Sequence, residues 1–182
     1  MLLDVYQHDI DKLKPFTDNG IVIDTGVMLD LVQGIIDTRF RRKKPSPTSD
    51  YALAISLLEF YNLIGQWNKF FITPHILTEV CRNMQSLFGT TPEYKRIILE
   101  ILPILEPMGE RQADKDNFMK LIDRKNPVLQ AGDISVYVAT EDIISSGQKI
   151  ALLSKDGKLC GTYSQHPNVM VLDPKSMLSL VN

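Results

Sequence analysis

The stretch Gly20-Ile21-Val22-Ile23-Asp24-Thr25 decides the fold: it is a short apolar run that ends in an acid and a hydroxyl residue. Later apolar runs resemble it, being rich in β-branched or large apolar side chains without polar alternation. Such runs are typical of strands that are buried on both faces of a sheet. The predicted strands span residues 20–24, 69–73, 150–154 and 168–173.

Helical patterns lie between these strands. Leu53, Leu57 and Phe60 recur at helical spacing, and Thr73-Pro74 and Thr91-Pro92 each indicate a helix cap followed by proline. Because strands alternate with helices, we expect an α/β fold, a three-layer α/β/α arrangement with a mostly parallel, doubly wound central sheet. The predicted helices span residues 27–36 and 51–67, start at 74, and span 92–103, 114–124 and 133–145.

Length and composition fit one globular domain over residues 1–182. Hydrophobic residues make up 44% of the chain and charged residues 23%, which excludes a disordered or fibrous protein. No apolar run approaches the roughly 18 residues of a membrane span, and no basic stretch precedes an apolar core at the amino terminus. Cys81 and Cys160 are too few for a disulfide framework or a thiolate zinc site. We therefore expect a cytoplasmic protein with no membrane attachment.

Two segments depart from the alternation of strands and helices. Residues 1–19 predict a short, loosely attached lead-in, and residues 38–50 predict an insertion loop. The net charge of −2 argues against a generally basic nucleic-acid-binding surface, but this loop is locally basic. It is interpreted either as a solvated linker or as an arm that contacts phosphates. Its basic residues are Arg39, Arg41, Arg42, Lys43 and Lys44.

Acidic residues follow the predicted strands or lie near the starts of helices. In an open α/β sheet, ligands bind at the carboxyl ends of the strands, so we expect these acids to converge on one rim. Taken singly, an acid there could cap a helix or form a turn with glycine. Four acids together repel one another unless cations share the site, and oxygen ligands favour Mg²⁺ or Mn²⁺. The four are Asp24, Glu79, Asp133 and Asp156.

The order of these residues resembles the PIN-domain ribonucleases, a family that includes the toxins of VapBC toxin–antitoxin modules. The resemblance spans about residues 20–173 and is carried by Asp24-Thr25, by Glu79, by the Gly132-Asp133 helix and by Ser154-Lys155-Asp156. Thr25 and Ser154 match the small hydroxyl positions of the family. The lead-in, the basic loop and the stretch 103–115 are additions to the family pattern.

The resemblance implies metal-dependent hydrolysis of RNA phosphodiester bonds. It implies Asp24 and Asp133 as the central ligands of Mg²⁺ or Mn²⁺, with Glu79 and Asp156 completing the site. Thr25 and Ser154 would orient ligands or phosphate by hydrogen bonding. An RNA substrate, an antitoxin protein and a second copy of the chain are the partners that the family suggests.

Other interpretations have less support in the residues. A haloacid-dehalogenase-type phosphatase needs a second aspartate two residues after Asp24, where this chain has Gly26, and a glycine-rich nucleotide loop is absent. The alternative from another class is a non-catalytic RNA-binding or protein-interaction module. Loss of acids would be its sign, and all four are present. His75, one turn before Glu79, either supports that acid or is a partly buried structural histidine.

Overall fold

The computed structural model describes residues 2–89, 91–124 and 131–181, and its strands form one all-parallel sheet. This arrangement confirms the predicted α/β fold. The strand order is β3-β2-β1-β4-β5, so β1 pairs with β2 on one side and with β4 on the other. Chain order therefore reverses between β1 and β4. The strands are β1 (Ile21–Ile23), β2 (Phe70–Ile72), β3 (Gly109–Glu110), β4 (Ile150–Leu153) and β5 (Val169–Leu172).

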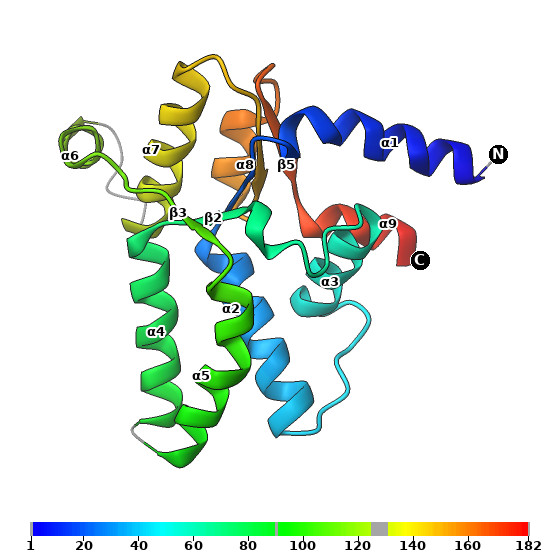
Figure 1. The fold of residues 1–182 in the computed structure, drawn as a ribbon, viewed down its shortest axis with the longest axis vertical. Coiled ribbons are helices and arrows are strands. Elements are labelled where there is room, and N and C mark those ends of the chain that lie inside the picture. The colour runs from blue at the N-terminus through cyan, green and yellow to red at the C-terminus, as the bar shows by residue number, and fades with distance from the viewer. Residues whose placement is uncertain (1, 90, 125–130, 182) are drawn as a thin grey trace.

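Helices cover both faces of the sheet. The helices α7 and α8 lie on one side and α1 and α3 on the other, while α2, α4 and α5 project together away from the sheet (Figure 1). In the described ranges, no helix is long and apolar enough to cross a membrane. The helices are α1 (Leu2–Thr17), α2 (Thr25–Ile35), α3 (Asp50–Phe60), α4 (Pro74–Phe88), α5 (Pro92–Leu105), α6 (Lys115–Arg124), α7 (Ala131–Ser145), α8 (Gly157–Tyr163) and α9 (Leu178–Val181).

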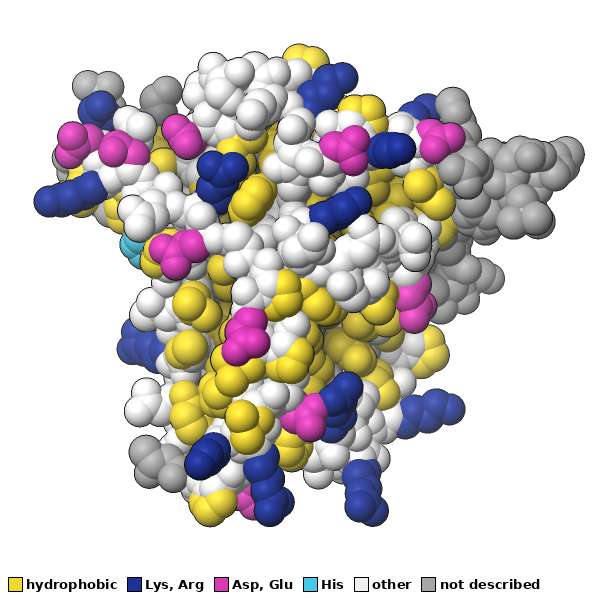
Figure 2. Space-filling model, viewed as in Figure 1, with side chains coloured by type: hydrophobic (Ala, Val, Ile, Leu, Met, Phe, Trp, Pro, Cys, Tyr) yellow, Lys and Arg dark blue, Asp and Glu magenta, His cyan; other side chains and the backbone are white. Residues whose placement is uncertain are grey.

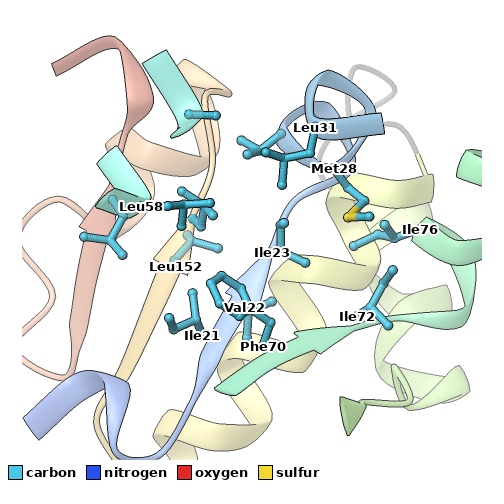
Figure 3. Packing of buried hydrophobic residues seen from close by; sticks show 14 of the residues in the cluster. Ile21, Val22, Ile23, Met28, Leu31, Leu58, Phe70, Ile72, Ile76 and Leu152 are labelled. Carbon is cyan, nitrogen blue, oxygen red and sulfur yellow. The ribbon is translucent and has the colours of Figure 1, made fainter. Parts of the chain in front are cut away.

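The hydrophobic core is centred on β1. Ile21, Val22 and Ile23 are each 0% exposed, and because successive strand residues point to opposite faces, both faces of β1 are covered. Side chains from α2, α3, α4 and the neighbouring strands meet around β1 (Figure 3). The packing thus holds the first strand, and the residues that follow it, in a fixed place.

The helix predicted over 51–67 ends early. The helix α3 stops at Phe60 because Asn62 adopts a left-handed conformation with φ of 53°, and the Leu63 N–H donates to the Leu58 carbonyl at 2.7 Å. Asparagine tolerates this conformation, which closes a helix end. The apolar pattern continues beyond the helix because Leu63 is buried and Trp67 packs against the core from a short 3₁₀ helix (Trp67–Lys69).

The prediction of a loosely attached lead-in was wrong for its second half. Residues 2–17 form α1, which packs against β4 and β5. Leu13 is 3% exposed, and the ammonium group of Lys149 lies 5.3 Å from the centre of the Phe16 ring. These contacts attach the end of α1 to the sheet.

The edge strand β3 was not predicted, because its two residues carry no apolar run. Its register sets Gly109 opposite Phe71, where a Cβ on residue 109 would lie 2.6 Å from Phe71 Cδ1. Glycine therefore permits this close pairing. Two residues of the stretch 103–115, Gly109 and Glu110, therefore belong to the sheet.

The contact between α2 and α3 depends on Gly34. A Cβ at this buried position would lie 1.9 Å from Tyr51 Cδ2 and 2.1 Å from Cγ, atoms that cannot move without moving the whole ring. We expect Gly34→Ala to lower the free energy of unfolding by about 1–3 kcal/mol in urea denaturation, as overpacking does. Gly161→Ala in α8, where no atom lies within 4 Å, is the control and should not destabilise the protein. Equal loss in both variants would contradict the prediction.

Candidate functional site

As predicted, the four acids line one cleft, of about 350 Å³, at the carboxyl ends of the strands. Asp24 directly follows β1, and Asp156 follows β4 by three residues, so the cleft lies where strand order reverses. Glu79 reaches it from α4 and Asp133 from α7. We call this the acidic cleft, and its lining residues are Asp24, Thr25, Gly26, Leu29, Asp50, Glu79, Asp133, Lys155, Asp156 and Lys175.

Asp24 occupies the N-cap position of α2, but its side chain makes no capping hydrogen bond. Its Oδ2 instead accepts a hydrogen bond of 2.8 Å from the Ser154 hydroxyl. The side chain is 3% exposed, and its other oxygen, Oδ1, has no hydrogen-bond partner among the described residues. Helix capping therefore does not explain this aspartate.

The environment of Asp24 disfavours its charge. Burial is the main cause that raises the pKa of Asp24 to about 6, and repulsion from Asp133 and Asp156 adds to it. The hydrogen bond from Ser154 acts in the opposite direction. A carboxylate in this setting would gain from a nearby cation.

Ser154 connects two of the acids. While its hydroxyl donates to Asp24, the same Oγ accepts the N–H of Asp156 at 3.0 Å. Asp156 in turn caps α8, since its Oδ1 accepts from the N–H groups of Lys158 and Leu159 at 2.9 and 2.8 Å. The turn that the Asp156-Gly157 pair predicts is therefore the start of a helix.

A second polar network joins the helices that carry the other two acids. The Thr73 and Ser135 hydroxyls lie 2.7 Å apart, both residues are fully buried, and the Ser135 hydroxyl donates to the Gly132 carbonyl at 2.7 Å. Thr73 also caps α4, as predicted. Asp133 is the third residue of α7 and not its N-cap. The alternative prediction, that this acid serves only to cap its helix, was therefore wrong. The network holds the starts of α4 and α7 together.

Gly132 allows oxygen atoms to gather beside α7. A Cβ on residue 132 would lie 2.7 Å from Thr25 Oγ1 and 3.0 Å from Glu79 Oε2. Thr25 is 6% exposed, and its Oγ1 has no hydrogen-bond partner among the described residues. Two buried oxygens without partners, Asp24 Oδ1 and Thr25 Oγ1, thus stand on adjacent residues at the cleft.

This oxygen-rich set fits a hard divalent cation such as Mg²⁺ or Mn²⁺. Asp24, Asp133 and Asp156 also lie at or within the first turn of three helix N-termini, whose positive ends favour anionic groups. Among the described residues, no three His, Cys, Asp or Glu side chains are already gathered at metal-binding spacing. The argument that the cleft suits a divalent cation therefore depends on the two unpartnered oxygens and on the oxygen atoms of the four acids.

Two lysines to which the sequence assigned no role, Lys155 and Lys175, also line the acidic cleft. The Lys155 ammonium group lies 2.6 Å from oxygens of both Asp30 and Asp50. Burial lowers the pKa of Lys155, but these two hydrogen bonds outweigh it and the net shift is upward, so the lysine stays charged. Lys175 is exposed and donates to the Lys155 carbonyl at 3.2 Å. The sequence carries no signal for the ion pairs of Lys155, because Asp30 and Asp50 lie more than 100 residues before it along the chain.

The basic loop does not form one continuous surface. Arg39 forms an ion pair with Glu100, and Arg41 pairs with Asp37 at 3.1 Å. Of the other three, Lys43 and Lys44 line a groove of about 390 Å³. A shared lining residue, Asp50, joins this groove to the acidic cleft. Arg42 is exposed and has a φ of 50°.

His75 is exposed, so its interpretation as a partly buried structural histidine was wrong. Its ring stacks on that of Phe118 from α6, with centroids 4.8 Å apart and an angle of 12° between the planes. Sequence spacing relates His75 to Glu79, but it carries no signal for this contact with a distant segment.

Comparison of the chain with protein-family models, with curated proteins and with solved structures found no match. The geometry of the acidic cleft therefore carries the functional argument.

The raised pKa of Asp24 predicts a pH-dependent stability. Because this carboxyl binds its proton more tightly in the folded protein than in the unfolded chain, the free energy of unfolding should fall as pH rises from 3.8 to about 6. The rise of the Asp24 pKa from 3.8 to about 6 corresponds to about 3 kcal/mol of unfolding free energy. We expect Asp24→Asn to be more stable than the parent by about 1–3 kcal/mol at about pH 7 and to match it at about pH 3.

Denaturant unfolding in EDTA across this pH range measures the effect, with Asp142→Asn as the control because Asp142 is exposed near the far end of α7. An Asp24→Asn variant that is no more stable than the parent at neutral pH would contradict the prediction.

Proposed function

We propose that this protein is a PIN-like, metal-dependent endoribonuclease of the cytoplasm that hydrolyses RNA phosphodiester bonds at the acidic cleft. The observation that carries the proposal is the pair of buried, unpartnered oxygens, Asp24 Oδ1 and Thr25 Oγ1, in a cleft that Glu79, Asp133 and Asp156 also line. The position of the cleft at the reversal of strand order supports a ligand site.

The chain's own residues divide into ligands and positioning residues. Asp24 and Asp133 would hold Mg²⁺ or Mn²⁺ centrally, with Glu79 and Asp156 completing the set. The bound ion would activate water and stabilise the charge that develops on the phosphate. Ser154 fixes Asp24 by donating to Oδ2, which leaves Oδ1 for the ion.

The cations around the cleft would serve the RNA backbone. Lys175 is an exposed residue that lines the cleft, and Lys43 and Lys44 line the groove that adjoins the cleft through Asp50. Lys155 has two carboxylate partners, so its role is to hold Asp30 and Asp50 in place. Neutralising several phosphates in this way makes binding salt-dependent.

A toxin role would add an antitoxin protein as partner, and a second copy of the chain is a further candidate partner. A neighbouring small gene for a DNA-binding antitoxin would support the toxin role. The alternative function is a non-catalytic RNA-binding or protein-interaction module, which would use the same surface without a working metal site.

Cleavage of end-labelled single-stranded RNA tests the proposal. We expect cutting with Mn²⁺ or Mg²⁺ and none in EDTA. The cleavage rate of Asp133→Asn should be about 100-fold lower than that of the parent, because a metal ligand is lost. Asp142→Asn, the same change farther along α7, should cut as the parent does. Saturating Mn²⁺ should also raise the melting temperature of the parent but not of Asp133→Asn.

Two outcomes would contradict the nuclease. Cutting that persists unchanged in Asp133→Asn would place the activity elsewhere or in a contaminant. A folded protein that neither cuts several RNAs nor gains stability from metal would favour the binding module.

The groove of Lys43 and Lys44 predicts where RNA binding is sensitive to charge. We expect the double variant Lys43→Glu/Lys44→Glu to bind a fluorescent single-stranded RNA at least about 10-fold more weakly at low salt, with a shallower salt dependence. The matched control is Lys12→Glu/Lys14→Glu, since both lysines are exposed near the end of α1, which leads into the amino end of β1 and so lies away from the cleft. Equal weakening in both double variants would indicate a general charge effect and overturn the assignment.

A further inference from the structure

A second cavity, of about 410 Å³, adjoins the acidic cleft, and Glu79 lines both. We call it the side pocket. It lies between the start of α4 and the start of α7, two helices that contact each other. Its lining residues are Pro74, His75, Thr78, Glu79, Arg82, Ala131 and Gly132.

One face of α4 supplies most of the side pocket. His75, Glu79 and Arg82 stand at positions i, i+4 and i+7, which share a side of a helix. Glu79 faces the cleft where we propose that phosphodiester bonds are cut. The other two side chains therefore lie within one helical turn of that site, on either side of Glu79.

His75 offers a supported aromatic face. Phe118 stacks on one side of the imidazole ring, and Phe118 does not line the side pocket. Because His75 itself lines the pocket and is exposed, we infer that Phe118 supports the ring from α6 and leaves its other face to the pocket. A base can stack on such a surface whatever its identity, since every nucleobase has a π-face.

Arg82 supplies the charge for a phosphate. It is exposed and forms no ion pair with any residue in the described ranges, whereas Arg39 and Arg41 are paired with acids. The guanidinium group is suited to bidentate contact with phosphate oxygens. The lysines of the acidic cleft, Lys155 and Lys175, follow β4 and β5, whereas Arg82 lies on α4, which follows β2. Arg82 is thus the cation of the side pocket.

We propose that the side pocket binds the nucleotide next to the scissile phosphate, with its base stacked on His75 and its phosphate paired with Arg82. Phe118 is a positioning residue for the His75 ring. The proposal rests on the nuclease function proposed above, and it adds the residues that would position the RNA strand beside the cut.

Binding measurements test this without requiring cleavage. The probes are a fluorescent single-stranded octaribonucleotide and an abasic ribose-phosphate strand of the same length, both bound to protein in the Asp133→Asn background. We expect His75→Ala to weaken binding of the octaribonucleotide about 10-fold and to leave the abasic strand unchanged, because only the stacked base is lost. His75→Phe should retain the parent's preference for the strand with bases.

Arg82→Ala should weaken both strands, because it removes a phosphate contact, whereas Arg96→Ala on α5 is the matched control and should weaken neither. His75 and Arg82 are both exposed, so their variants should melt at the parent's temperature. If His75→Ala binds both strands as the parent does, or if His75→Phe is as weak as His75→Ala, the stacking subsite is overturned.

Cleavage by protein with an intact Asp133 separates failure of the subsite from failure of the nuclease. The substrate carries a single abasic nucleotide that is moved along the strand. At one position beside the cut, the missing base should slow the parent but not His75→Ala. Cutting that is insensitive to His75 at every position would overturn the subsite and leave the nuclease. Base-dependent binding that His75→Ala abolishes, without any metal-dependent cutting, would support the subsite and contradict the nuclease.

Discussion

The buried carboxylate of Asp24 is the constraint on which the site depends. It lies at the end of a strand whose three residues are fully buried, so it cannot move out to water without disturbing the core. One oxygen is held by Ser154, which directly follows the adjacent strand β4, and the other lacks a partner among the described residues. The resulting upward pKa shift is a free energy cost that the fold accepts at this place, and such costs cluster where a ligand relieves them.

Two polar networks bring the acids to this carboxylate from distant parts of the chain. Ser154, 130 residues after Asp24, links it to the turn that carries Asp156. Thr73 and Ser135, 62 residues apart, join the helices of Glu79 and Asp133. Because all these hydroxyls are buried, each hydrogen bond forms where its loss would leave an unsatisfied polar group. The networks therefore fix both helix positions and acid positions.

The surface around the cleft carries cations beside the acids. Lys155 and Lys175 line the cleft together with the acids, Lys43 and Lys44 line the adjoining groove together with aspartates, and Arg82 lines the side pocket. A polyanion at the cleft would contact these cations, and a divalent ion between the carboxylates would reduce their repulsion. Figure 2 colours side chains by type in the view of Figure 1 and shows Lys and Arg spread among acidic and apolar side chains.

The sequence by itself determined the strands β1, β2, β4 and β5, the caps of α4 and α5, and the identity of the acids, because each depends on residues that are close along the chain. It did not predict β3, the early end of α3 or the packing of α1, which depend on Phe71, Asn62 and the sheet edge. Only the tertiary structure decided that Asp24 is bound by Ser154 and not by its own helix, that Gly132 brings Thr25 and Glu79 together, and that His75 stacks on Phe118. Local propensity cannot encode such contacts, since they form between segments that meet only when the sheet is complete.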